Sequence, residues 1–206
     1  MKLSKGKIIT LSVILLLLID QIIKFAVKLN MTIGESIHVF GDWFQICFVE
    51  NNGMAFGMQF GGVIGKILLT VFRIILIGGI IYYLRKVLLK NSDTPTGVLV
   101  GVSLVLVGAI GNVVDCIFYG QIFSASSYGM LAEFLPSGGG YAPLMMGKVV
   151  DMFYFPLIES TFPEWLPIWG GEHFIFFRPV FNFADSCISV GVVYMLLFQY
   201  KYFSRS

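Results

Sequence analysis

Two aspartates, Asp151 and Asp185, occupy positions where a carboxylate is costly. Asp151 lies among apolar residues in KVVDMF (148–153), and Asp185 ends FNFAD (181–185), which opens the last apolar run of the chain. A carboxylate at the edge of hydrocarbon usually has a function and a partner. Brought together across the loop between them, the two can share one proton, because adjacent like charges do not both ionise easily. An ionised and a protonated aspartate side by side can activate water against a carbonyl, which is the chemistry of an aspartyl peptidase.

The composition indicates a membrane protein. Of the 206 residues, 57% are hydrophobic and 13% are charged, and the mean hydropathy is +0.84. Soluble proteins carry about 25% charged residues, and a membrane-spanning helix needs roughly 20 apolar residues. Four stretches meet that length, at about residues 8–29, 64–84, 97–118 and 183–203. We therefore predict an all-α membrane protein with four transmembrane helices, forming one integral membrane domain over residues 1–206.

Basic residues near the ends of the predicted spans set the orientation. They gather before the first span, between the second and third, and after the fourth: Lys2, Lys5, Lys7, Arg85, Lys86, Lys90, Lys201 and Arg205. We expect both termini to be cytoplasmic and the long loops, residues 30–63 and 119–182, to be extracytoplasmic. The net charge of +2 reflects this topology. No basic run interleaved with aromatic residues points to nucleic acid as a partner.

The two outward loops are rich in aromatic residues. Residues 43–49 crowd aromatic and β-branched side chains before the turn-forming Asn51, Asn52 and Gly53, and the later loop contains WLPIW and HFIFF. Such runs between turn residues predict short strands. We expect a small extracytoplasmic β part at the outer membrane surface, where Trp and Phe are favoured. It forms either a membrane-anchored hairpin or a docking surface.

Further polar residues fall near the outward ends of the predicted spans. Asp20 and Lys24 are one helical turn apart and can pair within the helix, either as a structural ion pair or as a substrate contact. Asn112 and Asp115 are three residues apart and share one helical face. Asp20, Asp115 and Asp185 thus come from three spans and reach a similar depth, which indicates a site.

Three other features concern how the spans are built. Asn182 and Asp185 have the spacing of a helix capping box, which does not exclude catalysis by the same residues. Arg73 lies well inside the second span, where we expect it to pair with a carboxylate or a carbonyl in a packing role. Gly108 and Gly111 allow close approach of another helix.

The sequence offers no pattern for a metal or a cofactor. Cys47, Cys116 and Cys187 are far apart, and His38 and His173 are isolated, so no zinc-ligand spacing is present. Glycine-rich phosphate loops, HExxH pairs and GxSxG elbows are also missing. We expect reduced cysteines, no metal and no cofactor.

Two alternatives come from other functional classes. A small proton- or ion-coupled transporter would also carry Asp, Lys and Arg within its spans. Against it, the halves show no inverted repeat, and no helix is interrupted near the bilayer centre. A non-catalytic membrane scaffold would leave Asp151 and Asp185 unexplained.

Taken in order along the chain, these residues form a recognisable pattern. The chain resembles the lipoprotein signal peptidases, also called signal peptidase II. The matching motifs are LLxIDQxxK at residues 16–24, NNGMAF at 51–56, GNVVD at 111–115, and KVVDMF with FNFAD. Each motif alone is weak, but the set in this order relative to four spans is specific and covers nearly the whole chain.

The resemblance implies an intramembrane aspartyl endopeptidase, multi-pass in the bacterial cytoplasmic (inner) membrane, with its active site toward the outer, periplasmic face. It implies a diacylglyceryl-modified prolipoprotein as substrate, cut just before the lipidated cysteine, with membrane lipids as further partners. We expect a monomer. By motif, Asp151 and Asp185 match the catalytic aspartates of the family. Supporting positions are matched by Asn51, Asn112, Asp115, Asn182, Asp20 and Lys24.

The chain departs from the family pattern at two points. The family usually has arginine directly after the aspartate of GNxxD, where this chain has Cys116, and a long insertion over about residues 120–148 separates GNVVD from KVVDMF. The insertion is expected to change the loop over the site and not the catalytic pair. For the missing guanidinium we expect Arg178, seven residues before Asp185, to be the replacement, because its planar fork suits a carboxylate or carbonyl.

Overall fold

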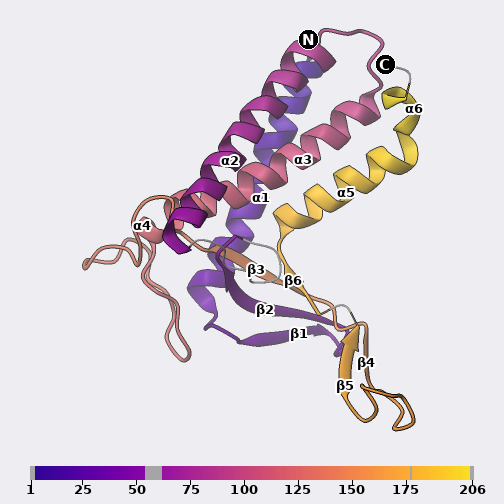
Figure 1. Cartoon of the computed structure of the whole chain (residues 1–206). Helices are drawn as coiled ribbons and strands as arrows, with labels where there is room; N and C mark the ends of the chain where they lie inside the picture. The colour runs from indigo at the N-terminus through magenta and orange to yellow at the C-terminus, as the bar shows by residue number, and fades with distance from the viewer. Residues whose placement is uncertain (1–2, 54–61, 177, 205–206) are drawn as a thin grey trace.

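The structure is a computed structural model that describes residues 3–53, 62–176 and 178–204. Four longer helices form a bundle, and a small sheet lies at one end of it, while both termini lie at the other end (Figure 1). The helical elements are α1 (Lys5–Asn30), α2 (Gly62–Tyr83) with the π-helical turn η2 (Leu84–Leu88), α3 (Thr96–Val114) with the π-helical turn η3 (Asp115–Tyr119), α4 (Gly120–Ile122), α5 (Phe183–Phe198) and α6 (Tyr200–Phe203).

Three helical stretches are long and apolar enough to cross a membrane: Lys5–Asn30, Gly62–Leu88 and Thr96–Ile122. They contain the first three predicted spans. The fourth predicted span, residues 183–203, is divided, because α5 ends at Phe198 and α6 begins after Gln199. The 16 residues of α5 extend about 24 Å, less than the roughly 30 Å of a bilayer core. The described residues thus form three helical stretches long and apolar enough to span a membrane and one shorter apolar helix.

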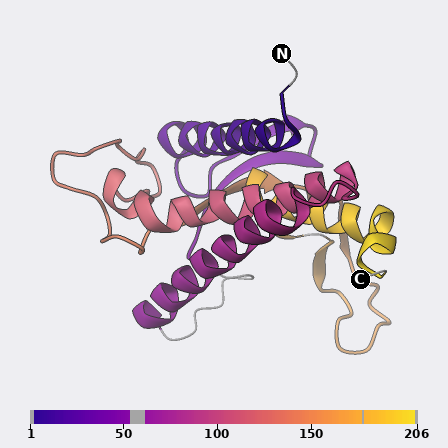
Figure 2. The same cartoon turned by 90° about the horizontal axis from the view of Figure 1, so that it is seen from above.

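Helix α3 is the centre of the bundle. It packs against α1, α2 and α5, and it lies between α1 and α2 when the bundle is viewed from above (Figure 2). In its most apolar stretch 56% of the residues are buried, against 11% in α1 and in α2. Pro95, directly before the first turn, suits this helix start because its nitrogen needs no acceptor.

The glycines of α3 set how closely α5 can approach. A Cβ on Gly108 would collide with the carbonyl oxygen of Ala184 and with the side chain of Ile188. A Cβ on Gly111 would lie 2.6 Å from Oδ2 of Asp20 and 3.1 Å from Cβ of Ala184. The close helix approach predicted for this pair of glycines is therefore present, and it brings α1, α3 and the start of α5 together.

The two long loops contribute a four-stranded antiparallel sheet in the order β1-β2-β3-β6. Its strands are β1 (Ser36–Phe40), β2 (Phe44–Asn51), β3 (Val149–Tyr154) and β6 (Val180–Phe181). A separate hairpin, β4 (Ile158–Thr161) and β5 (His173–Phe176), extends from the sheet between β3 and β6 (Figure 1). The predicted aromatic strands are thus present, with stacked rings such as Phe44 on Phe155 at 4.7 Å between centroids. Of the NNGMAF motif, residues 54–56 lie outside the described part of the chain.

The register of β2 and β3 positions two of the singled-out residues. Asp151 lies opposite Val49, and Asn51 is two residues further along β2. Side chains two apart on a strand share one face, so Asn51 and Asp151 are diagonal neighbours on the same side of the sheet. Further along β3, Phe153 and Tyr154 pair with the two residues of β6. Strand β6 is followed almost directly by α5.

The close packing of α3 on α5 can be tested with two glycine substitutions. Gly108→Ala should destabilise the protein by about 1–3 kcal/mol, because the added methyl group has no room at Ala184 and Ile188. Gly78→Ala in α2 is the matched control, since nothing lies within 4 Å of a Cβ there. Thermal unfolding of the purified proteins in detergent measures both. Equal melting temperatures for Gly108→Ala and Gly78→Ala would contradict the packing described.

Candidate functional site

Asp151 and Asp185 are joined by one side chain, that of Asn182. Asn182 Nδ2 donates to Asp151 Oδ1 at 2.7 Å, and its Oδ1 accepts from the backbone N–H of Asp185 at 2.9 Å. The backbone N–H of Asn182 donates to Asp185 Oδ2 at 3.3 Å, which completes a capping box at the start of α5. A local device that begins a helix therefore also brings the carboxylate of α5 to the carboxylate of β3.

Two further asparagines hold the outer oxygens of the pair. Asn51 Nδ2 donates to Asp151 Oδ2 at 3.3 Å, and Asn112 Nδ2 donates to Asp185 Oδ1 at 2.7 Å. Asn112 Oδ1 accepts from Asn182 Nδ2 at 3.0 Å. Three amides from β2, α3 and the start of α5 thus connect the two carboxylates.

Beneath the asparagines lies a fully buried ion cluster. Lys24 Nζ lies 2.9 Å from Asp20 Oδ2 and 2.8 Å from Asp115 Oδ2, and all three side chains are 0% exposed. The same ammonium donates to Asn112 Oδ1 at 3.1 Å. Since no part of the ion pair reaches the surface, this geometry favours a structural ion pair over a substrate contact. The Lys24 proton also fixes the orientation of the Asn112 amide, which then offers its N–H groups to Asp185.

The remaining oxygens of Asp20 and Asp115 are also paired. Asp20 Oδ1 accepts from the backbone N–H of Ala184 at 3.0 Å, which ties α1 to the start of α5. Gln21 Nε2 lies 3.0 Å from both Asp20 Oδ2 and Asp115 Oδ1, and Gln21 Oε1 accepts from the Tyr119 hydroxyl at 3.1 Å. Buried charges of this kind are tolerated only when such bonds satisfy them.

Sequence reasoning did not single out Gln21 or Tyr119. Gln21 lies directly after Asp20 in the motif of residues 16–24, and this position could have marked it as a residue of the site. Tyr119 ends the π-helical turn η3 that begins at Asp115. Such turns inside longer helices often occur at functional sites, because they redirect side chains.

Burial makes Asp151 a weaker acid than an ordinary aspartate. The side chain is 3% exposed, and its burial together with the nearby charge of Asp185 raises the pKa of Asp151 to about 7. Hydrogen bonds from Asn182 and Asn51 act in the opposite direction. A carboxyl group with this pKa keeps its proton until near-neutral pH, so the pair can hold one shared proton there.

Arg178 does not join this network. It is exposed and forms no hydrogen bond or ion pair with any residue that the structure describes. The register that pairs Phe153 with Phe181 and Tyr154 with Val180 carries Arg178 about five residues, or roughly 16 Å, beyond Asp151 along β3. The expected replacement of the missing guanidinium by Arg178 therefore finds no support in the geometry.

The guanidinium beside Cys116 belongs to Arg73. Its Nη1 lies 3.9 Å from Cys116 Sγ, and its Nη2 donates to the carbonyl oxygen of Gly53. The carbonyl partner expected for Arg73 is thus present. Gly53 has a φ of 88°, a conformation that favours glycine, and its N–H donates to Asn51 Oδ1 at 2.9 Å. Arg73 is therefore linked through Gly53 and Asn51 to Asp151.

The buried ion cluster makes a prediction about stability. Lys24→Met should destabilise the protein by about 3–5 kcal/mol, because Asp20 and Asp115 would be left buried without a cation. Lys7→Met in the same helix is the control, since Lys7 is exposed. Thermal unfolding in detergent should show a large drop for Lys24→Met alone. An unchanged melting temperature for Lys24→Met would mean that the lysine does not stabilise the two acids.

Comparison with known proteins places this chain in a family. The family model described as signal peptidase (SPase) II matches residues 12–201. A lipoprotein signal peptidase of Porphyromonas gingivalis (strain ATCC 33277) is 53% identical over 196 residues, which cover 95% of this chain and 84% of the relative. A lipoprotein signal peptidase of Amoebophilus asiaticus (strain 5a2) is 39% identical over 188 residues, covering 89% of this chain and 74% of the relative.

A solved structure shares the fold. It is described as a bacterial membrane enzyme structure by the in meso method at 2.3 Å resolution, and it aligns with a TM-score of 0.63 at 22% identity. The alignment covers 98% of this chain and 93% of that one. Nothing in these similarities supports the transporter considered from the sequence. The extent of the family match and the identity to curated relatives show that this chain belongs to the signal peptidase II family.

Proposed function

We propose that the chain is an intramembrane aspartyl endopeptidase that removes signal peptides from diacylglyceryl-modified prolipoproteins and cuts just before the lipidated cysteine. The observation that carries the proposal is the contact of one asparagine, Asn182, with both Asp151 and Asp185, together with the near-neutral pKa of Asp151. The relatives named lipoprotein signal peptidase support the reaction and the substrate class.

We assign different roles to the two carboxylates because their surroundings differ. Asp185 is half-buried, accepts hydrogen bonds from Asn112 Nδ2 and the Asn182 N–H, and lies in the first turn of α5, where the helix dipole favours a negative charge. Asp185 is therefore the ionised partner and the general base. Asp151 is buried and has a pKa near neutrality, so it carries the proton. Its Oδ2, with the longer 3.3 Å contact to Asn51, is the better position for that proton.

Peptide hydrolysis then follows with a balanced exchange of protons. Asp185 takes a proton from water while the water oxygen attacks the scissile carbonyl carbon, and Asp151 gives its proton to the carbonyl oxygen. A neutral gem-diol results. Asp185 next gives its proton to the leaving nitrogen as the C–N bond breaks, and Asp151 recovers a proton from the diol. The pair ends with one proton, as it began.

The proposed supporting residues act at two levels. Asn51, Asn112 and Asn182 bond the carboxylates directly, and their remaining amide groups can also bind an extended substrate backbone. Asp20, Lys24 and Asp115 form the ion cluster behind Asn112 and stabilise its orientation. Loss of an amide should therefore change catalysis, while loss of the lysine should first change stability.

We place the protein in the cytoplasmic membrane of a bacterium with both termini cytoplasmic and the sheet at the outer face. The clustering of basic residues at the end of the bundle away from the sheet supports this orientation. The shorter α5, followed by α6, is proposed as the fourth span, since together they cover residues 183–203 apart from Gln199. We further propose that it acts as a monomer with the lipidated substrate and membrane lipids as partners.

We also propose Arg73 as a positioning residue for the reaction. Its guanidinium bonds the Gly53 carbonyl, and Gly53 bonds Asn51, which donates to Asp151. Because Arg73 belongs to α2, its bond to Gly53 ties α2 to the turn at residues 51–53. Arg73 makes that contact beside Cys116, the position where the family resemblance leads one to expect arginine.

The catalytic assignment is tested by isosteric substitutions. Asp151→Asn and Asp185→Asn should each lower cleavage of a diacylglyceryl-modified prolipoprotein by about 10²- to 10⁴-fold, because neither variant can share the proton. The measurement is single-site cleavage in detergent or vesicles, followed by mass analysis of the products. Asp42→Asn is the control, since that side chain is 96% exposed in the turn between β1 and β2.

Two outcomes would contradict the proposal. Wild-type rates in either aspartate variant would remove the pair from catalysis. Equal cleavage of lipidated and unlipidated prolipoprotein would show that the diacylglyceryl group is not part of the recognised substrate.

The role of Arg73 is tested by substitution and rescue. Arg73→Ala should lower kcat about 10- to 100-fold, as expected for loss of a charged hydrogen bond that supports Asn51. Arg73→Ala combined with Cys116→Arg should recover part of that loss, because the guanidinium is resupplied from the neighbouring position. Arg178→Ala is the matched control and should cleave at the wild-type rate.

A purely structural role for Arg73 would give a different result. Arg73→Ala would then lower the melting temperature without a change in kcat for the folded fraction, and the second substitution would not restore the rate. A loss of rate in Arg178→Ala would instead support Arg178 as the replacement for the missing guanidinium.

A further inference from the structure

A cavity of about 540 Å³ lies between the start of α2 and the inserted segment. Val63 and Lys66 of α2 line one wall, while residues 141–143 of the insertion and Lys148 line the other. The cavity adjoins Asn52 but contains neither aspartate of the proposed catalytic pair. It is therefore separate from the proposed catalytic pair, and it is built largely by the part of the chain that departs from the family pattern.

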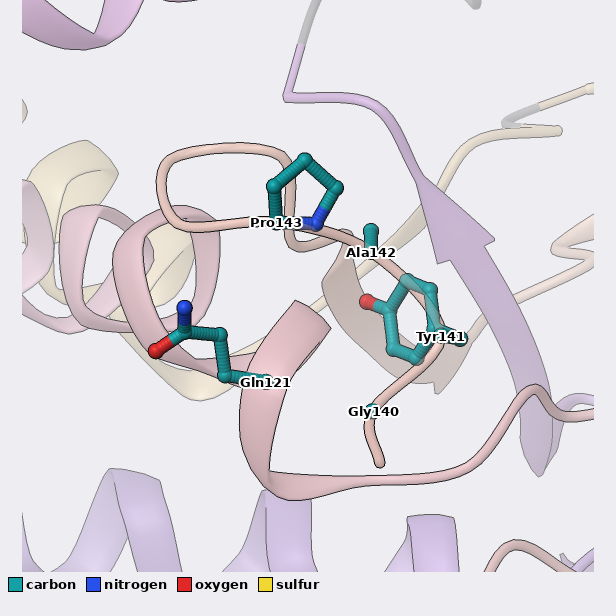
Figure 3. A pocket seen from close by; sticks show the side chains of 5 residues that line it. All are labelled: Gln121, Gly140, Tyr141, Ala142 and Pro143. Atoms are coloured by element: carbon teal, nitrogen blue, oxygen red, sulfur yellow. The ribbon is translucent and has the colours of Figure 1, made fainter. Parts of the chain in front are cut away.

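The wall from the insertion is fixed by close backbone packing. Ala142 N–H donates to the Gly120 carbonyl at 2.9 Å, and Tyr141 N–H donates to the Phe123 carbonyl at 3.0 Å. A Cβ on Gly120 would lie 2.8 Å from the Ala142 carbonyl oxygen, so the segment lies flush against the end of α3 and α4. Figure 3 shows the same segment at a neighbouring pocket of about 600 Å³, where Tyr141 to Pro143 lie opposite Gln121. The wall formed by residues 141–143 is thus held against α4 by backbone contacts.

Positive charge is in excess around this cavity. Lys28 and Lys148 bind the two oxygens of the same carboxylate, Glu50, with Lys148 at 3.0 Å. Burial alone would raise the pKa of Glu50, but the charge of Lys28 and the hydrogen bonds that Glu50 accepts lower it, so Glu50 stays ionised. The two ammonium groups of Lys28 and Lys148 thus share one carboxylate, which leaves one positive charge in excess.

Lys66 adds a third cation that has only neutral partners. It is 9% exposed and donates to Asn52 Oδ1 at 3.2 Å and to the Met146 carbonyl at 3.0 Å. It pairs with no carboxylate among the described residues, and positions 54–61 contain no Asp or Glu. Three lysines and one glutamate therefore leave two positive charges, and both Lys66 and Lys148 line the cavity.

The surroundings favour a lipid as the source of the missing anion. The cavity opens at the first turn of α2, where the helix dipole also favours negative charge. In that turn, Val63 and Ile64 are 59% and 71% exposed on a helix long and apolar enough to span the membrane. An anion bound here therefore lies beside a surface that suits acyl chains, which free phosphate would leave uncovered.

We propose that this cavity binds the phosphate group of an anionic phospholipid from the leaflet at the sheet end of the bundle. Lys66 and Lys148 donate to the phosphate oxygens, and the acyl chains lie along Val63 and Ile64. The insertion then has a function of its own, because it forms the wall that closes the headgroup site. The proposal does not depend on the peptidase assignment, since binding is measured without cleavage.

The test is native mass spectrometry of the delipidated full-length protein with phosphatidylglycerol, with phosphatidylcholine, or with inorganic phosphate. Wild-type protein should retain one phosphatidylglycerol at concentrations where phosphatidylcholine and inorganic phosphate are lost. Lys66→Gln and Lys148→Gln should each weaken that retention about fivefold or more. Lys66→Arg, which keeps the charge, should retain it. Lys90→Gln is the control, because Lys90 is exposed after η2 at the opposite end of the bundle.

Three results would overturn the proposal. Equal retention of phosphatidylglycerol and phosphatidylcholine would show that charge is not recognised. Unchanged retention in Lys66→Gln would show that the lipid binds elsewhere. Binding of inorganic phosphate as tight as that of phosphatidylglycerol would assign the cavity to a free anion. Melting temperatures of all variants, compared with wild type, exclude unfolding as the cause of any loss.

Discussion

The site depends on one buried cation. Lys24 lies between Asp20 and Asp115 and donates to Asn112, so it neutralises carboxylates from two helices and orients the amide that contacts Asp185. Without a cation, two acids at that depth would each carry a large desolvation cost. Glycine makes the arrangement possible, because only the missing side chain at Gly111 leaves room for the Asp20 carboxylate against α3. The close packing of α1 on α3 and the pairing of the buried charges therefore depend on each other.

The proposed mechanism also requires that the sheet and the start of α5 give Asp151 and Asp185 different surroundings. The sheet buries Asp151, and burial beside Asp185 raises its pKa to about 7. Asp185 lies in the first turn of α5, where it accepts hydrogen bonds from Asn112 and from the backbone N–H of Asn182. Two chemically identical side chains thus have different surroundings, and the proposed mechanism gives them different roles for that reason. Asn182 contacts both residues, because it donates to the Asp151 carboxylate and accepts from the backbone N–H of Asp185.

Much of this arrangement was predictable from local spacing. The i, i+4 pair of Asp20 and Lys24, the capping box at Asn182 and the apolar stretches each follow from a short-range rule, and the motif order predicted their convergence. Contacts between distant segments were less accessible. Arg73 and Cys116 are 43 residues apart, and no local rule predicts that the side chain of one reaches the other. Arg178 was expected near the site because of its closeness in sequence to Asp185, but the strand register carries it away. The break at Gln199, which shortens α5, likewise has no signal in the hydropathy of that stretch.

In the proposed mechanism Asp151 and Asp185 act together while holding a single proton. The most direct measurement is the pH dependence of kcat/KM for cleavage of a diacylglyceryl-modified prolipoprotein by the wild-type protein. Because the raised pKa of Asp151 is about 7, the pair loses its proton above that pH, and the rate should fall about tenfold per pH unit toward pH 9. Tryptophan fluorescence over the same range shows that the protein stays folded. A rate that is constant or still rising between pH 7 and pH 9 would contradict the shared proton and with it the proposed mechanism.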